Sequence, residues 1–221
     1  MNTEKIHVYF VPGLAAGKEI FRNINLPPER YEIHILEWLI PQEKESIQQY
    51  ARRMADQVTH SNVVLAGVSF GGVMVQEMNE FLDLRKLVII SSVKTKHELP
   101  LRLKWVRKTG AYKLLPTGWA LSVKDLTKLA IGPRSKKRLT LYQEYLSVRD
   151  RNYLDWAIKQ MVCWERTQPI EGIEHIHGDL DIVFPIKNIT NYILLEGGNH
   201  VMILNKGSKV SKLLENIIES A

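Results

Sequence analysis

Residues 62–82 carry the pattern of a buried strand, a tight turn and a helix in direct succession, and the turn reads Gly-Val-Ser-Phe-Gly-Gly. The apolar run 62–68 predicts a fully buried strand, and the following pattern predicts a helix to about residue 82. Glycines at Gly67 and Gly71 let the strand and the helix approach closely around Ser69. A serine on such a turn is lifted out of the backbone, so Ser69 is a candidate nucleophile. The alternative is a glycine-rich structural turn.

The other apolar runs alternate with helical patterns, and this alternation predicts a mostly parallel sheet with helices on both faces. A helix is expected to begin at Ser46, where Gln49 would complete a capping box. A last amphipathic helix should bury one face near the end of the chain. The expected strands cover residues 6–11, 31–36, 62–68, 87–90, 173–176 and 193–195.

The alternation of strands and helices stops between residues 93 and 166, where the pattern is helical and basic. A chain of 221 residues favours one core, so we expect a single domain, 1–221, carrying an inserted helical segment, 93–166. Residues 94–151 hold fifteen Lys or Arg against four Asp or Glu, a local charge of +11. Since the whole chain carries +6, the remainder carries −5, and the basic character belongs to the insertion.

Composition excludes several classes of protein. The basic charge comes without a nucleic-acid-binding motif, so no nucleic-acid partner is expected. The first residues show no cleavage site of a secretory signal, and no apolar run reaches the roughly 18 residues of a membrane span. The single Cys163 excludes an internal disulfide, and its apolar neighbours predict a core position. We therefore expect a soluble, cytoplasmic protein, and no His and Cys spacing suggests a metal or another cofactor.

Acyl transfer by a serine requires a base, an acid that orients the base, and N–H donors for an oxyanion. His200 follows the last expected strand in a glycine-bearing loop, and Asp181 follows the strand before it. The backbone N–H groups of Leu14 and Phe70 are the candidate oxyanion donors. Asp179 is the rival acid on the same turn as Asp181.

In these residues and their order, the sequence resembles the α/β-hydrolase fold family. The order serine, acid, histidine, each at a strand end, is the order of that family. The resemblance implies a reduced sheet of about six strands, a cap formed by residues 93–166, and an acid at Asp181 rather than Asp179. The loop after the first strand departs from many relatives, since Pro12-Gly13 replaces His-Gly. The four motifs that carry the resemblance cover residues 10–17, 67–72, 176–185 and 197–202.

The resemblance implies a serine hydrolase that cleaves a small carboxylic ester or thioester through an acyl-enzyme on Ser69, without a cofactor. Because the cap is basic and interleaves apolar residues, its substrate is expected to have an apolar acyl part and an anionic tail. Two alternatives stay open. The same residues could serve a lyase or a carbon–carbon bond hydrolase, or the protein could be a non-catalytic ligand-binding member of the fold. The oligomeric state is not indicated.

Overall fold

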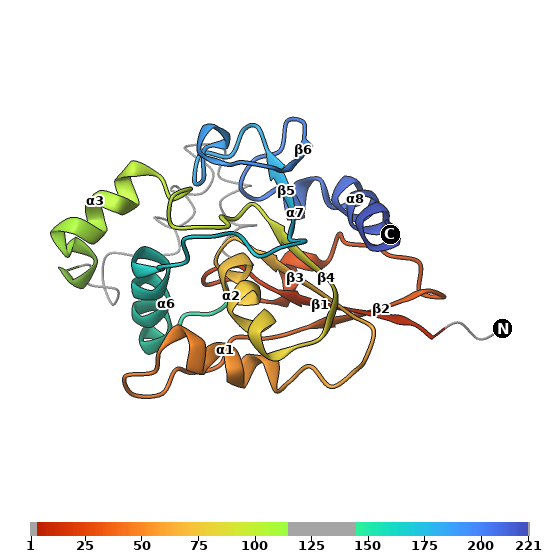
Figure 1. Ribbon diagram of the computed structural model, residues 1–221, viewed down its shortest axis with the longest axis horizontal. Helices are drawn as coiled ribbons and strands as arrows, with labels where there is room; N and C mark the ends of the chain where they lie inside the picture. Colours follow the sequence, from red (N-terminus) through yellow and green to blue (C-terminus); the bar gives the residue numbers. More distant parts are fainter. Residues whose placement is uncertain (1–3, 115–144, 221) are drawn as a thin grey trace.

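The computed structural model describes residues 4–114 and 145–220, and its centre is one sheet of parallel strands (Figure 1). The six strands lie in the order β2-β1-β3-β4-β5-β6 and every neighbouring pair is parallel. The predicted sheet is therefore confirmed. The strands are β1 (Ile6–Val11), β2 (Tyr31–Ile35), β3 (Val63–Val68), β4 (Leu84–Ile90), β5 (Glu174–Gly178) and β6 (Ile193–Leu195).

Helices cover both faces of the sheet and bury alternate residues of its strands. On one face, side chains such as Tyr9 and Leu65 pack with α1 (Ile47–Ala55), α2 (Phe70–Met78) and α6 (Arg151–Cys163). On the other, Val8, Phe10 and their neighbours pack with α7 (Met202–Asn205) and α8 (Gly207–Glu219). The two apolar layers come from the two faces of the same strands, as a fully buried parallel sheet requires.

Helix boundaries follow the local signals in the sequence. The capping box at the start of α1 is confirmed, because the Ser46 hydroxyl accepts from Gln49 N and the Gln49 side chain accepts from Ser46 N. The elbow helix is shorter than predicted. It ends at Met78 and passes into a 3-10 turn, Asn79–Phe81. Two further 3-10 turns, Lys18–Phe21 and Ile186–Asn188, lie in loops.

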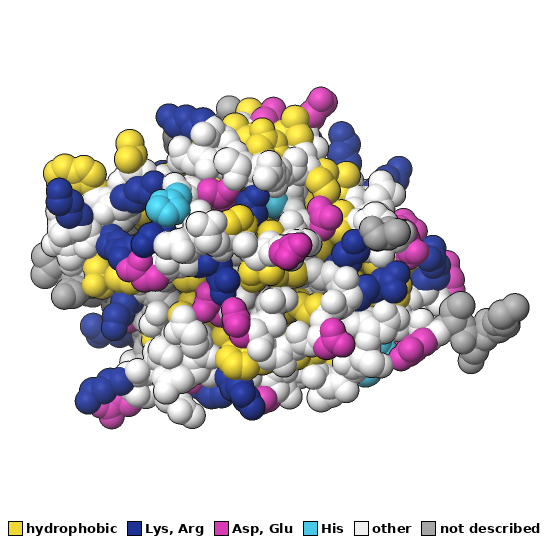
Figure 2. All heavy atoms as spheres, viewed as in Figure 1, with side chains coloured by type: hydrophobic (Ala, Val, Ile, Leu, Met, Phe, Trp, Pro, Cys, Tyr) yellow, Lys and Arg dark blue, Asp and Glu magenta, His cyan; other side chains and the backbone are white. Residues whose placement is uncertain are grey.

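The basic insertion is described only in part, because residues 115–144 lie outside the described residues. Its first part forms α3 (Leu101–Thr109) and a 3-10 turn, Ala111–Leu114, and its last part forms α6. The apolar residues that interleave with charges in the insertion differ in burial along α3. Leu103 is half-buried and packs against the core, whereas Leu101 and Trp105 are 76% and 69% exposed. Figure 2 shows basic and apolar side chains intermixed on the side of the molecule that carries α3.

The prediction for Cys163 is wrong in one respect. Its side chain is only half-buried, because it ends α6, and the following Trp164 takes the buried position. Within residues 4–114 and 145–220, none of the helices has the length and apolar character needed to cross a membrane.

Candidate active site

Ser69 lies on a strained turn between β3 and α2. Its backbone has φ 54° and ψ −117°, a conformation that side-chain-bearing residues rarely adopt. The turn is held by two hydrogen bonds, from Ser69 N to Ile90 O at 2.9 Å and from the Ser92 hydroxyl to Ser69 O at 2.7 Å. The end of β4 and the residues that follow it therefore hold both the N–H and the carbonyl of Ser69.

Glycine is required on both sides of this turn. A Cβ atom on Gly67 would lie 2.2 Å from the Gly71 carbonyl oxygen. A Cβ atom on Gly71 would lie 2.3 Å from the carbonyl oxygens of Val11 and Pro12. Because these contacts are with backbone atoms, they cannot be relieved by rotating a side chain. The spacing of the two glycines thus allows the tight approach of β1, β3 and α2.

Three side chains from distant parts of the chain form one series of hydrogen bonds. Ser69 Oγ lies 3.0 Å from His200 Nε2, and His200 Nδ1 lies 2.9 Å from Asp181 Oδ2. Ser69 follows β3, Asp181 follows β5 and His200 follows β6, so all three lie at the carboxyl edge of the sheet. The structure therefore brings together the three residues that the sequence singles out.

Asp181 is buried, and its second oxygen is held by the backbone. Oδ1 accepts hydrogen bonds from Val183 N at 2.8 Å and Phe184 N at 2.9 Å. Burial by itself raises the pKa of Asp181, but the charge and hydrogen bond of His200 and the Phe184 N–H outweigh it and lower the pKa below its ordinary value. Asp181 is thus ionised at neutral pH, whereas Asp179 is exposed.

The loops that carry the acid and the histidine are joined to each other. Leu180 N donates to Gly198 O at 2.8 Å, which connects the turn after β5 with the turn after β6. The Phe184 ring lies edge-on to the His200 ring, with 5.4 Å between ring centres. These contacts fix the direction of the imidazole toward Ser69.

The candidate oxyanion donors lie beside Ser69. A Cβ atom built on Gly13 would lie 3.6 Å from the Ser69 Cβ atom, so the loop carrying Leu14 runs against the nucleophile. Trp38 Nε1 donates to Gly13 O at 3.1 Å and fixes this loop. Phe70 is the first residue of α2, where a helix leaves backbone N–H groups without intrahelical partners. Both N–H groups thus belong to segments that border the Ser69 side chain.

Two residues near the site were not recognised in the sequence. The buried His177 lies 3.8 Å from Asp181 Oδ2, and its Nε2 lies 2.9 Å from Phe184 O. Burial lowers its pKa, so it is a neutral imidazole behind the acid. Arg102 of α3 donates to the carbonyls of Ile182 and Val183 at 3.0 and 2.7 Å. His177 lies only four residues before Asp181, but a histidine inside a strand carries no signal of such a contact. Arg102 could not be recognised from the sequence, because only tertiary packing brings α3 to the loop after Asp181.

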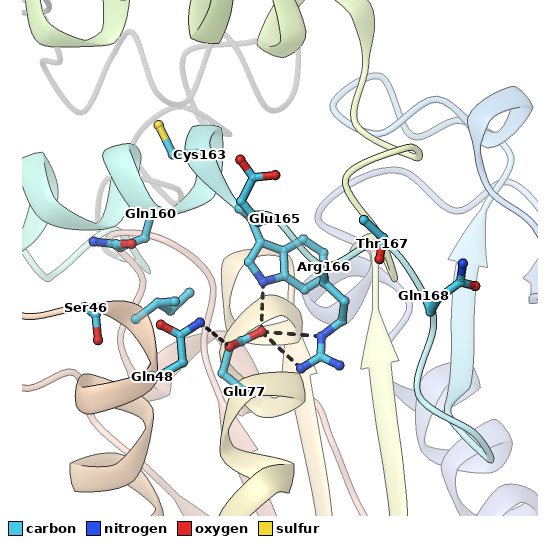
Figure 3. A pocket seen from close by; sticks show the side chains of 11 residues that line it. Ser46, Gln48, Glu77, Gln160, Cys163, Glu165, Arg166, Thr167 and Gln168 are labelled. Atoms are coloured by element: carbon cyan, nitrogen blue, oxygen red, sulfur yellow. Dashed lines mark hydrogen bonds and ion pairs between the residues drawn. The ribbon is translucent and has the colours of Figure 1, made fainter.

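A hollow of about 530 Å³ lies elsewhere, between the start of α1, the end of α2 and the end of α6 (Figure 3). Glu77 accepts hydrogen bonds there from Trp164 Nε1 and Gln48 Nε2, each at 2.9 Å, and Arg166 Nη2 lies 3.3 Å away. Because the carboxylate is already bound on both oxygens, it links α2 to the chain after α6. Ser69 does not line this hollow.

Comparisons with known proteins agree with this architecture. No protein-family model and no curated protein sequence matches the chain. Solved structures do match. A bromoperoxidase from Bacillus anthracis is 16% identical with a TM-score of 0.73, covering 98% of this chain and 93% of its own. A hydrolase from Oleispira antarctica is 12% identical with a TM-score of 0.74, covering 100% and 93%.

A structure of carboxylesterases from the thaumarchaeon Nitrososphaera gargenis is 12% identical with a TM-score of 0.70, covering 97% of this chain and 90% of its own. Identities this low establish the fold and not the activity. Three observations indicate the same fold: the parallel sheet, the serine turn after β3, and the structural similarity over almost the whole chain. The chain has the α/β-hydrolase fold.

Proposed function

We propose that this protein is a serine hydrolase that cleaves a small carboxylic ester or thioester through an acyl-enzyme on Ser69. The observation that carries the proposal is the hydrogen-bond series Ser69–His200–Asp181, with distances of 3.0 and 2.9 Å. A serine hydroxyl on a strained turn, within reach of an imidazole held by an ionised carboxylate, is the arrangement that activates serine for acyl transfer. Several structural neighbours are named esterase, lipase or hydrolase, which supports the same chemistry.

In the proposed cycle, His200 Nε2 takes the Ser69 proton as the oxygen attacks the carbonyl carbon. The N–H groups of Leu14 and Phe70 bind the developing oxyanion. His200 returns the proton to the leaving alcohol or thiol, and then activates a water that releases the acid from Ser69. Asp181 stays ionised and holds the Nδ1–H tautomer of His200 throughout.

The substrate is proposed to carry an apolar acyl part and an anionic tail, selected by the basic segment 93–166. Two observations support a position of the described parts of this segment, 93–114 and 145–166, next to the site. Arg102 of α3 is hydrogen-bonded to the backbone of the loop that carries Asp181. In addition, Val148 N donates to Ala15 O at 3.1 Å, which joins the end of the insertion to the loop of Leu14.

A fluorophosphonate probe tests the proposal directly, because it reacts with activated serines. The wild type should be labelled at Ser69 and should hydrolyse p-nitrophenyl esters. Ser69→Ala should lose both properties, while Ser208→Ala, which changes an exposed serine of α8, should keep both. Folded wild-type protein without Ser69 labelling would overturn the proposal. Labelling without ester turnover would point to lyase or carbon–carbon bond chemistry instead.

A further inference from the structure

Three histidines gather at one edge of the sheet, away from the candidate active site. His7 lies on β1, His34 lies on β2, and His60 lies in the loop before β3. One nitrogen from each imidazole lies within 4.8 Å of the other two. Along β3, residue 63 pairs with His7 and Ser69 is six residues further on, so at about 3.3 Å per residue the two sites are about 20 Å apart. The cluster therefore lies outside the proposed catalytic machinery.

The spacing of the His7 and His34 nitrogens is close to that of two metal ligands. His7 Nδ1 and His34 Nε2 are 3.0 Å apart. Two zinc–nitrogen bonds of about 2.0–2.1 Å at a tetrahedral angle put two nitrogens about 3.3 Å apart. Glu32 lies opposite His7 in the sheet, and its oxygens are 3.9 Å from His7 Nδ1 and 3.9 Å from His34 Nε2. A carboxylate is thus within reach as a fourth ligand.

The third imidazole has a partner that orients it. The hydroxyl of the buried Tyr9 lies 2.5 Å from His60 Nδ1, so Nε2 of the same ring is left for another contact. Metal-bound histidines in proteins generally have their second ring nitrogen hydrogen-bonded in this way. His60 is exposed, and its ring stacks on His7 with 3.9 Å between ring centres. His60 is thus held next to His7, with one ring nitrogen open to an ion.

The imidazoles are available as ligands. His7 and His34 are partly buried while Glu32 is exposed, so an ion can enter from solvent. Three imidazoles with one carboxylate suit a borderline divalent ion such as zinc.

We propose that His7, His34 and His60, with Glu32, form a binding site for a divalent transition metal of the zinc class. The bound ion would connect β1, β2 and the loop before β3. It would stabilise this edge of the sheet, because a ligand that binds the folded state shifts the folding equilibrium.

The test uses tag-free, metal-stripped protein titrated with Zn²⁺ in a calorimeter. The wild type should bind zinc at a single site, and saturating zinc should raise its Tm by about 5 °C or more. His60→Ala, in an exposed loop, should weaken binding at least about tenfold and lose the rise in Tm. His97→Ala, which removes an exposed imidazole elsewhere, should bind as the wild type does.

Two further measurements locate the ion. Cobalt should give the strong visible absorption of a four-coordinate site with nitrogen and oxygen ligands, and His34→Gln should abolish it. His200→Ala should keep full zinc binding, since His200 belongs to the other site. Wild-type protein that binds no zinc, or zinc binding that is lost in His200→Ala and kept in His60→Ala, would overturn the proposal.

Discussion

The properties of single residues at the candidate site follow from their partners. Asp181 Oδ1 accepts two backbone N–H groups, and Oδ2 faces His200 Nδ1. The carboxylate therefore fills two roles, since it closes the turn after β5 and selects the imidazole tautomer. Asp179, two residues away, has neither contact and is exposed.

Asp181→Asn is expected to lower kcat by about 10³–10⁴-fold while the protein remains folded. The amide oxygen must accept from the N–H groups of Val183 and Phe184, so its NH₂ group faces His200 Nδ1. The imidazole then carries its proton on Nε2 and cannot accept one from Ser69. Steady-state hydrolysis of a p-nitrophenyl ester measures the loss. Asp179→Asn should keep near-normal activity, and equal losses in the two variants would contradict this role.

At the scale of elements, the site depends on how closely β1, β3 and α2 approach one another. That approach is set by Gly67 and Gly71, whose missing side chains leave room for backbone oxygens. The strain at Ser69 is maintained because Ile90, at the end of β4, and Ser92, just after it, hold the turn.

Gly71→Ala should destabilise the protein by about 3 kcal/mol, because the new Cβ atom overlaps two backbone oxygens and α2 must move away from β1. Gly13→Ala is the matched control. Its Cβ atom would make only ordinary contacts at 3.6 Å, so its free energy of unfolding should change by less than about 0.5 kcal/mol. Urea denaturation measures the free energy of unfolding of both variants. Similar stabilities for the two variants would show that the close approach is not required.

Strand β5 also contains a pair of buried histidines. His177 Nδ1 lies 3.1 Å from His175 Nε2, and His175 Nδ1 has no hydrogen-bond partner within the described part of the chain. Burial, the neighbouring His177 and the charge of Lys94 hold the pKa of His175 well below 6.5. The folded protein therefore keeps this ring neutral in mild acid.

Stability should fall as the pH drops below about 6.5, because the unfolded chain then binds a proton on His175 that the folded protein does not bind. His175 accounts for a loss of at most about 1.4 kcal/mol per pH unit. Above about pH 6.5, the free energy of unfolding does not depend on this residue's titration. His175→Gln should lose less stability than the wild type between about pH 7.5 and pH 5.5, as measured by urea denaturation. His97→Gln should follow the wild type. Parallel pH curves for His175→Gln and the wild type would contradict the prediction.

At the scale of the whole molecule, charge is distributed unevenly. Residues 94–151 carry +11, and the rest of the chain carries −5. Some of this charge is paired, since Lys96 and Arg107 both contact Glu165. Other cations, such as Lys108 on α3, are exposed. A surface of one sign beside a site raises the local concentration of oppositely charged substrates.

Accordingly, kcat/KM for an ester with a carboxylate tail should fall several-fold from about 20 to about 300 mM NaCl, because salt screens charges beyond about 10 Å. A neutral ester of similar size should show no such change. Lys108→Glu should reduce the salt dependence, whereas Lys212→Glu on α8 should leave it unaltered. An anionic ester that is insensitive to salt would rule out electrostatic steering.

Much of this protein could be predicted from the sequence, because strand runs, turn glycines and helix caps are local signals. The features predicted from local signals include the positions of all six strands, the capping box at Ser46 and the turn around Ser69. So does the order of Ser69, Asp181 and His200, since parallel strands bring their carboxyl ends to one edge of a sheet.

Only the tertiary structure decided which side chains share an environment. Strand pairing places His7 beside His34, and the packing of α3 places Arg102 beside the loop that carries Asp181. It also leaves the apolar residues Leu101 and Trp105 on the surface. Local signals govern the backbone of each segment, whereas side-chain contacts depend on pairings between segments far apart in the chain. The serine turn could therefore be recognised from sequence alone, but the histidine cluster could not.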